Sequence, residues 1–162
     1  MEDVEISGYR PGAIGKITEL HARYYSQESG FGLFFESKVA REMSEFLGRM
    51  DESRDGFWVA IVGEEIVGSL ALDGIEARSK GAHLRWFIVS PPYRGRGIGN
   101  RLLREALDFC RESGFKRVYL WTFEGLDRAR HLYEKYGFTV SKELDNNQWG
   151  VTVHEQMFEL FL

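Results

Sequence analysis

Between an apolar run and a long amphipathic segment, the chain reads Val89-Ser90-Pro91-Pro92-Tyr93-Arg94-Gly95-Arg96-Gly97-Ile98-Gly99-Asn100. Glycine at every second position from 95 to 99 lets the backbone turn tightly and leaves its N–H groups unobstructed by side chains. Such a turn at the start of a helix binds phosphate, because the exposed N–H groups and the helix dipole both favour an anion. Arg94 and Arg96 add positive charge, which favours a pyrophosphate over a single carboxylate. The stretch therefore predicts a phosphate-binding loop between a strand and a helix.

Two other phosphate-binding loops share this richness in glycine. A Walker loop requires Lys-Ser or Lys-Thr after its last glycine, and Asn100-Arg101 excludes it here. A dinucleotide fingerprint would use Gly95 and Gly97, but Asn100 stands where its third glycine belongs. Glu124, near the end of the next strand, could bind a ribose in that fold. The order of elements disfavours it, because antiparallel strands and two helices precede the loop.

Periodicity on both sides of the loop predicts the remaining elements. Apolar residues alternate or run together in segments typical of strands, and they recur at spacings of three and four in segments typical of helices. We predict strands at residues 4–9, 57–62, 66–72, 83–89, 116–122, 138–144 and 151–160, and helices at residues 14–25, 34–50, 97–113 and 127–136.

Two features of this order set the sheet topology. The turn Gly63-Glu64-Glu65 separates two strands by a hairpin spacing, so these strands should be antiparallel. The succession of strand, helix and strand from residue 83 to residue 122 predicts a parallel pair joined by a right-handed crossover. The sequence thus predicts the α/β class, as an α+β mixed sheet of about seven strands flanked by about four helices. The sheet should be mostly antiparallel, with the parallel pair beside the glycine-rich loop.

Composition limits the classes of protein to consider. A chain of 162 residues with 43% hydrophobic content predicts a single domain over residues 1–162. The 25 acidic residues outnumber the 21 Lys and Arg, and this net charge of -4 disfavours nucleic-acid binding. Cys110 cannot form an internal disulfide or a multi-cysteine metal site, and we interpret it as a core thiol. Without a long apolar run, we expect a soluble, cytoplasmic protein that does not bind membranes.

A family resemblance rests on two motifs together. The pattern Arg94-x-x-Gly97-x-Gly99 follows an apolar strand, and further on the chain reads Ala129-Arg130-His131-Leu132-Tyr133-Glu134-Lys135-Tyr136-Gly137-Phe138. This pair resembles the GNAT superfamily of acetyl-CoA-dependent N-acetyltransferases, whose fold matches the predicted strand order over nearly the whole chain. Segments such as Gln148-Trp149-Gly150 also look like the acetyltransferase half of MarR–GNAT fusion proteins. Because the first strand is expected near Val4, the DNA-binding half of those fusions does not carry over.

The resemblance implies which residues bind acetyl-CoA. The backbone of Phe87, Ile88 and Val89 would pair with the pantetheine arm, and a main-chain N–H there would polarise the thioester carbonyl. The loop would bind the pyrophosphate through Arg94, Gly95, Arg96, Gly97, Ile98, Gly99 and Asn100, and Arg130 would add a contact. Many relatives place an asparagine after the fifth strand, where this chain has Phe123-Glu124-Gly125-Leu126-Asp127. The contact of that asparagine to the pantetheine arm is either missing here or supplied by Asp127.

The resemblance also implies catalytic and acceptor residues. Tyr133 stands at the position of the tyrosine that protonates the departing thiolate, although it could instead be a packed helix residue. Tyr136 is a weaker choice for that donor. His83 could relay a proton from the amine or be a surface histidine at a strand start. Glu36 could bind a cationic amine or be a solvated residue at a helix start. The segment 29–34 could be a packed connector or a lid over the substrate.

These expectations lead to one preferred function and one alternative. The preferred function is transfer of an acetyl group from acetyl-CoA to a primary amine of a small molecule or peptide, without a metal. The alternative is a non-catalytic acyl-CoA-binding sensor or interaction module, which the missing asparagine and the insecure base favour. A homodimer is compatible with either.

Overall fold

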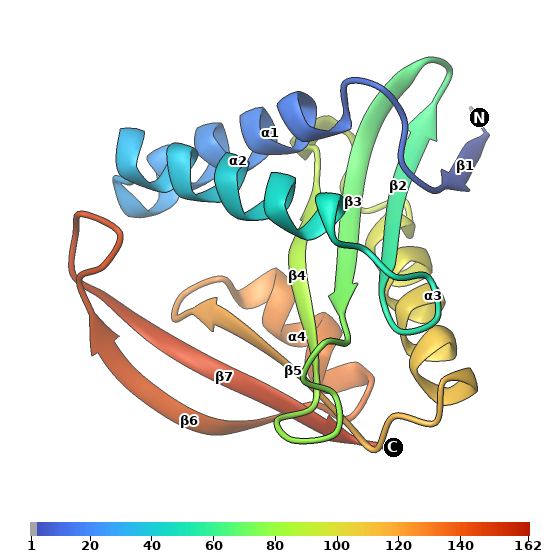
Figure 1. Ribbon diagram of the computed structural model, residues 1–162. Helices are drawn as coiled ribbons and strands as arrows, with labels where there is room; N and C mark the ends of the chain where they lie inside the picture. Colours follow the sequence, from blue (N-terminus) through green and yellow to red (C-terminus); the bar gives the residue numbers. More distant parts are fainter. Residues whose placement is uncertain (1–2) are drawn as a thin grey trace.

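The computed structural model describes residues 3–162 and contains one mixed sheet of seven strands (Figure 1). The strands are β1 (Val4–Ser7), β2 (Gly56–Val62), β3 (Glu65–Asp73), β4 (Ala82–Val89), β5 (Arg117–Phe123), β6 (Thr139–Asn146) and β7 (Val153–Phe161). Their order across the sheet is β1-β2-β3-β4-β5-β7-β6. Only β4 and β5 pair in parallel, and all other neighbours are antiparallel. The predicted sheet is thereby confirmed.

Helices cover both faces of the sheet. They are α1 (Ala13–Ser29), α2 (Leu33–Gly48), α3 (Ile98–Glu112) and α4 (Asp127–Lys135), and a short 3-10 turn, Pro91–Tyr93, precedes α3. In Figure 1, α1 and α2 lie in front of the sheet and α3 and α4 lie behind it. A separate apolar core fills each side, one built with α1 and α2 and one with α3 and α4.

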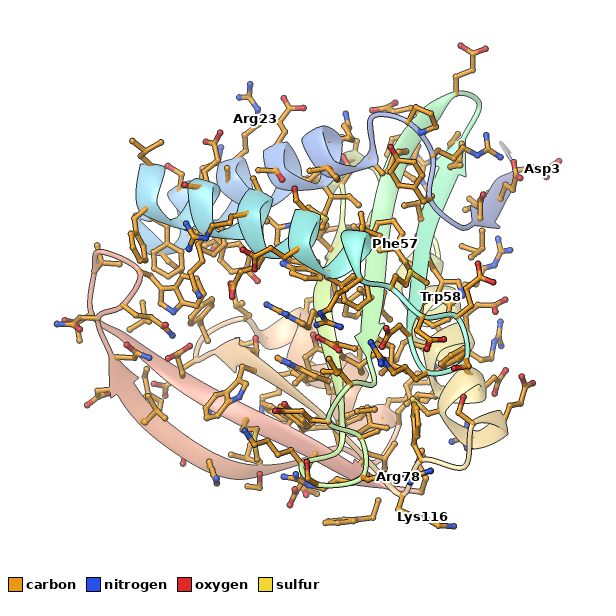
Figure 2. All side chains as sticks on the ribbon, in the orientation of Figure 1. Asp3, Arg23, Phe57, Trp58, Arg78 and Lys116 are labelled. Atoms are coloured by element: carbon orange, nitrogen blue, oxygen red, sulfur yellow. The ribbon has the colours of Figure 1, made fainter. Side chains whose placement is uncertain are left out.

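Neighbouring residues of β2 pack into different cores on the two faces of the sheet. Phe57 points towards α2 and belongs to the core of α1 and α2 (Figure 2). Trp58 points the other way, and its ring centroid lies 5.7 Å from that of Phe109 on α3. Because side chains alternate along a strand, a sheet covered on both faces needs apolar residues at successive positions. This explains the continuous apolar run of β2.

The helix α3 is the most regular match between sequence and structure. Its inward stripe, which includes Leu102, Leu103 and Leu107, is fully buried. Each such leucine stabilises the fold by about 2 kcal/mol relative to an exposed one. Gly114, at φ 75°, adopts the left-handed conformation that ends the helix. Burial raises the pKa of Cys110 on the same stripe to about 12, as fits a core thiol.

Several predicted boundaries were wrong by a few residues. The strand predicted at residues 4–9 ends at Ser7, and the helix predicted to end at residue 25 continues to Ser29. The reason in the second case is backbone geometry. Although no apolar residue follows Tyr25, nothing breaks the helix until Gly30 takes a left-handed conformation at φ 72°. Among the helices of residues 3–162, none is long and apolar enough to cross a membrane.

A bulge in β4 determines where the sheet opens. Trp86 has φ 50°, a left-handed conformation that costs a non-glycine residue about 1–2 kcal/mol. The pairing with β3 shifts register at this point, and the Ser69 hydroxyl donates a hydrogen bond of 2.6 Å to the Trp86 carbonyl. On its other side, β4 pairs with β5 only at Ala82 and His83. Beyond His83 the two parallel strands therefore diverge, and a cleft opens between their carboxyl ends.

Candidate active site

Two cavities meet inside this cleft. The first, which we call the loop cavity, has a volume of about 450 Å³ and lies against the glycine-rich loop, the end of β4 and α4. The second, which we call the aromatic cavity, has a volume of about 350 Å³ and lies against α2, β4, β5 and the β6–β7 loop. Both are lined by Tyr25, Phe87, Thr122 and Tyr133. The two cavities therefore lie side by side, and these four residues form the boundary between them.

The glycine-rich loop forms an open backbone nest at the start of α3. Gly95 and Gly97 have φ 78° and 80°, which L-residues with side chains rarely adopt. A Cβ at either position would have no atom within 4 Å, so the space beside this backbone is open. No acidic residue occupies the first turn of α3 to neutralise the helix dipole. The loop thus offers unobstructed N–H groups and partial positive charge to an anion, as predicted.

Cations around the loop cavity come from two elements. Arg94 lies in the loop, and Arg128 and Lys135 come from α4. The Arg94 Nε donates a hydrogen bond of 3.1 Å to the Val89 carbonyl, and its guanidinium lies 4.5 Å from the Tyr24 ring centroid. These contacts hold its charge beside the nest. Sequence reasoning missed Arg128 and Lys135, because a short helix rich in charged residues gives no sign of which charges face the sheet.

The end of β4 provides a free edge beside the nest. Phe87, Ile88 and Val89 all line the loop cavity, as the sequence predicted, together with Ile98, Gly99 and Asn100. On its β3 side, this part of β4 is paired, with Ile88 opposite Ser69 and Val89 opposite Gly68. On its β5 side it has no strand partner in the described chain. An extended ligand can therefore hydrogen-bond to this edge as an added strand would.

Tyr133 lies where the two cavities meet. Its side chain is only 5% exposed, and its ring packs against Phe87, Phe138 and Phe158 at centroid distances of 6.1, 5.9 and 5.8 Å. Burial raises the pKa of Tyr133, so its hydroxyl is protonated at neutral pH. By contrast, the Tyr136 hydroxyl donates a hydrogen bond of 2.7 Å to Asn100 Oδ1. Of the two tyrosines, Tyr133 is the one that lines both cavities.

His83 lines the aromatic cavity but is a weak base. Its ring stacks on Tyr119 at a centroid distance of 4.6 Å and an interplanar angle of 12°. Burial and the positive charge of Arg85 lower the pKa of His83 to about 3. The imidazole is therefore neutral at pH 7 and holds a proton poorly. This environment disfavours the predicted role as a proton relay.

Four predicted residues lie outside both cavities. Glu36 is exposed in the first turn of α2, and Arg96 is exposed with its guanidinium 5.0 Å from the Tyr93 ring centroid. Asp127 and Arg130 share the outward stripe of α4, where Arg130 Nε donates to Glu134 at 3.1 Å. Their placement gives no support to the predicted binding roles. The physical reason on α4 is helical spacing, because Arg128 and Leu132 turn a different face of the helix towards the loop cavity.

The connector between α1 and α2 is packed. Phe31 is buried, and its ring lies 5.9 Å from the ring of Trp149 and 5.3 Å from the ring of Phe123. Figure 1 shows this connector beside the loop that joins β6 to β7. Phe31 thus supports the packed connector, whereas Leu33 and Phe34 are exposed, so both interpretations of residues 29–34 stay open. Tyr25 also joins this group and reaches both cavities, and sequence reasoning missed it.

A second buried histidine gives the fold a pH dependence. His21 on α1 donates from Nδ1 to the Ile17 carbonyl at 2.8 Å, and burial lowers its pKa to about 4. The unfolded chain, with an ordinary histidine pKa of about 6.5, binds this proton more readily than the folded chain. The free energy of unfolding should therefore fall by about 3 kcal/mol from this group as the pH decreases from 6.5 to 4.

Urea unfolding at a series of pH values tests this dependence. His21→Gln, which keeps an uncharged donor, should show a shallower loss of stability between pH 6.5 and pH 4. Identical slopes for the wild type and the variant would show that His21 does not carry the effect.

Comparisons with known proteins were made for the whole chain. A sequence model of the acetyltransferase (GNAT) family matches residues 16–138. An uncharacterized N-acetyltransferase of Methanocaldococcus jannaschii is 33% identical over 122 residues, which cover 71% of this chain and 53% of that protein. Human N-acetyltransferase 8B is 35% identical over 104 residues, which cover 62% of this chain and 46% of that protein. The chain thus spans about half the length of the curated relatives it matches.

Solved structures share the fold over the full length. An acetyltransferase from Streptococcus agalactiae aligns with a TM-score of 0.77 at 25% identity and covers 100% of both chains. The PaiA N-acetyltransferase of Thermoplasma acidophilum, solved in complex with coenzyme A, aligns with a TM-score of 0.72 at 18% identity and covers 99% of both chains. At that identity the second likeness concerns the fold alone.

Proposed function

The chain belongs to the acetyltransferase (GNAT) family, and on this basis we propose that it transfers the acetyl group of acetyl-CoA to a primary amine of a small molecule or peptide. The observation that carries the proposal is the meeting of two cavities at Tyr133. One cavity has a phosphate nest and the other does not. Direct transfer requires a donor and an acceptor in contact, and the split sheet provides a place for each.

The residues of the loop cavity fit acetyl-CoA, which supplies the acetyl thioester when bound. The N–H groups of Gly95 and Gly97 and the start of α3 would bind the pyrophosphate. Arg94, Arg128 and Lys135 would balance its charge. The free edge of β4 would hydrogen-bond to the pantetheine arm, and one of its N–H groups would polarise the thioester carbonyl.

Two proton movements accompany the transfer. Tyr133 would donate its proton to the sulfur as the carbon–sulfur bond breaks, because its hydroxyl is protonated and its side chain lines both cavities. The amine loses a proton as it forms the new bond. His21 and His83, which line the aromatic cavity, have pKa values of about 4 and about 3. We therefore assign no histidine as the base and propose that this proton leaves through water.

A thiol-release assay tests the proposed activity. The protein is mixed with acetyl-CoA and a panel of amines, and free CoA and acetylated amine are measured in parallel. We expect equal amounts of both products with at least one amine. A tight acetyl-CoA complex that acetylates no member of the panel would contradict the enzyme and support the sensor alternative. The homodimer, the cytoplasmic location and the likeness to MarR–GNAT fusions stay predictions.

A further inference from the structure

A buried carboxylate without a cationic partner faces the aromatic cavity. Glu155 on β7 is 5% exposed and lines that cavity. Its carboxylate accepts hydrogen bonds from Asn146 Nδ2 at 2.5 Å and from Trp149 Nε1 at 3.3 Å. Neither donor carries a charge, and within residues 3–162 no Lys, Arg or His side chain pairs with this carboxylate. A buried carboxylate in this setting lacks the opposite charge that usually compensates its desolvation.

The second carboxylate of the same cavity provides a contrast. Glu42 on α2 also lines the wall, but it is bound by Lys38 at 2.9 Å and by Arg85 at 3.3 Å. Its charge is therefore compensated within the protein. An ionised carboxylate has about four lone-pair sites, and the two donors to Glu155 use two of them. Glu155 thus keeps acceptor sites that a ligand cation can use.

The walls around Glu155 suit an organic cation. Trp149 lies 5.4 Å from Phe35 and 6.0 Å from Phe123 between ring centroids, and all three rings line the aromatic cavity. Aromatic faces attract ammonium groups and bury apolar surface. The Lys38 ammonium already lies 5.4 Å from the Trp149 ring centroid, which shows that this ring can face a cation.

We infer that Glu155 binds the ammonium group of the acceptor, whose apolar part packs against the rings of Phe35, Phe123 and Trp149. The acceptor class is then an amine with an aromatic or other apolar body. This inference rests on the proposed function insofar as it takes the aromatic cavity for the acceptor site. It gives Glu155 a role in binding the acceptor and none in binding acetyl-CoA.

Two probes of nearly equal shape separate charge from packing. 2-Phenylethylamine carries an ammonium group at neutral pH, and 2-phenylethanol carries a neutral hydroxyl in its place. Trp86, Trp121 and Trp149 line the cavity, so tryptophan fluorescence can follow binding of either probe without turnover. The wild type should bind 2-phenylethylamine about tenfold more tightly than 2-phenylethanol, because a hydrogen bond between charged groups is stronger than a neutral one.

The variant Glu155→Gln keeps the shape of the side chain and removes its charge. It should bind 2-phenylethylamine about tenfold more weakly than the wild type and bind 2-phenylethanol within about twofold. The matched control is Glu45→Gln, because Glu45 is an exposed glutamate on α2 that lines neither cavity, and this variant should not reduce the preference for the cation. Equal weakening of both probes by Glu155→Gln would show that Glu155 only anchors Trp149 and Asn146, and would overturn the inference. A wild type that does not prefer 2-phenylethylamine overturns it without any variant.

The thiol-release assay with the same amine distinguishes this inference from the proposed function. Turnover that is the same in Glu155→Gln and wild type, with unchanged KM, would remove the ammonium site and retain the acetyltransferase. Binding that depends on probe charge and on Glu155, with no turnover of any amine, would retain the ammonium site and remove the acetyltransferase. If the ammonium site and the acetyltransferase activity both exist, the KM for 2-phenylethylamine should be about tenfold higher in Glu155→Gln, and the affinity for acetyl-CoA should be unchanged.

Discussion

Tyr133→Phe should lower kcat by roughly 10²-fold or more while acetyl-CoA binding and the fold are retained. The phenol ring packs against Phe87, Phe138 and Phe158, and phenylalanine keeps those contacts. Only the hydroxyl is lost, and a donor aimed at a developing thiolate acts mainly in the transition state. Calorimetry with CoA measures whether cofactor affinity is retained, and steady-state rates measure the loss of kcat.

Tyr136→Phe is the control for the loss of a phenol near the same helix. Its hydroxyl is used in a hydrogen bond to Asn100, so this variant should change kcat only slightly. Because product release can limit turnover, acetyl transfer must also be followed in a single-turnover experiment. Transfer at wild-type speed in Tyr133→Phe would reduce Tyr133 to a packing residue, and a bound water would have to supply the proton.

Gly97→Val should weaken acetyl-CoA binding by more than about 1.4 kcal/mol, or tenfold. The valine side chain would occupy the open space beside the nest, where the phosphates must approach the backbone. It would also force a β-branched residue into φ 80°, which lowers the free energy of unfolding by about 1–2 kcal/mol. Calorimetric titration of the folded variant with acetyl-CoA measures the first effect, and urea unfolding measures the second.

Gly114→Val separates these two effects. Gly114 has φ 75° and an equally open Cβ position, but it lies at the far end of α3 from the nest. The control should therefore lose similar stability and keep its affinity for acetyl-CoA. Equal affinities in Gly97→Val and the wild type would contradict the role assigned to the nest. Equal losses of affinity in the two variants would attribute the effect to strain in α3.

The parts of the candidate site whose geometry agrees with the expectation depend on local sequence. The nest is a run of glycines at the start of a periodic helix, so both its conformation and its place follow from neighbouring residues. The residues at the end of β4 and Tyr133 were predicted from a family resemblance, which rests on two motifs that each lie within one short segment. These residues line the loop cavity, and their roles in binding and catalysis stay predictions.

The parts that were missed depend on contacts between distant segments. The bulge at Trp86 carries no glycine or proline signal, and the Ser69 hydroxyl that bonds to it is 17 residues away. His83 resembles a surface residue in the sequence, and only packing against Tyr119 and the charge of Arg85 make its imidazole a weak base. Glu155 lies in a strand with several charged residues, and its burial results from the β6–β7 loop folding over it. Periodicity along one segment cannot show such contacts.

The bulge in β4 separates two kinds of recognition. On one side of the cleft, the end of the strand and the nest offer mainly backbone groups, which a change of side chain barely alters. On the other side, Glu155, Phe35 and Trp149 present side chains, and each can be exchanged without moving that backbone. Point substitutions in related sequences would therefore change which acceptor is bound, while the backbone groups proposed to bind the donor would be retained.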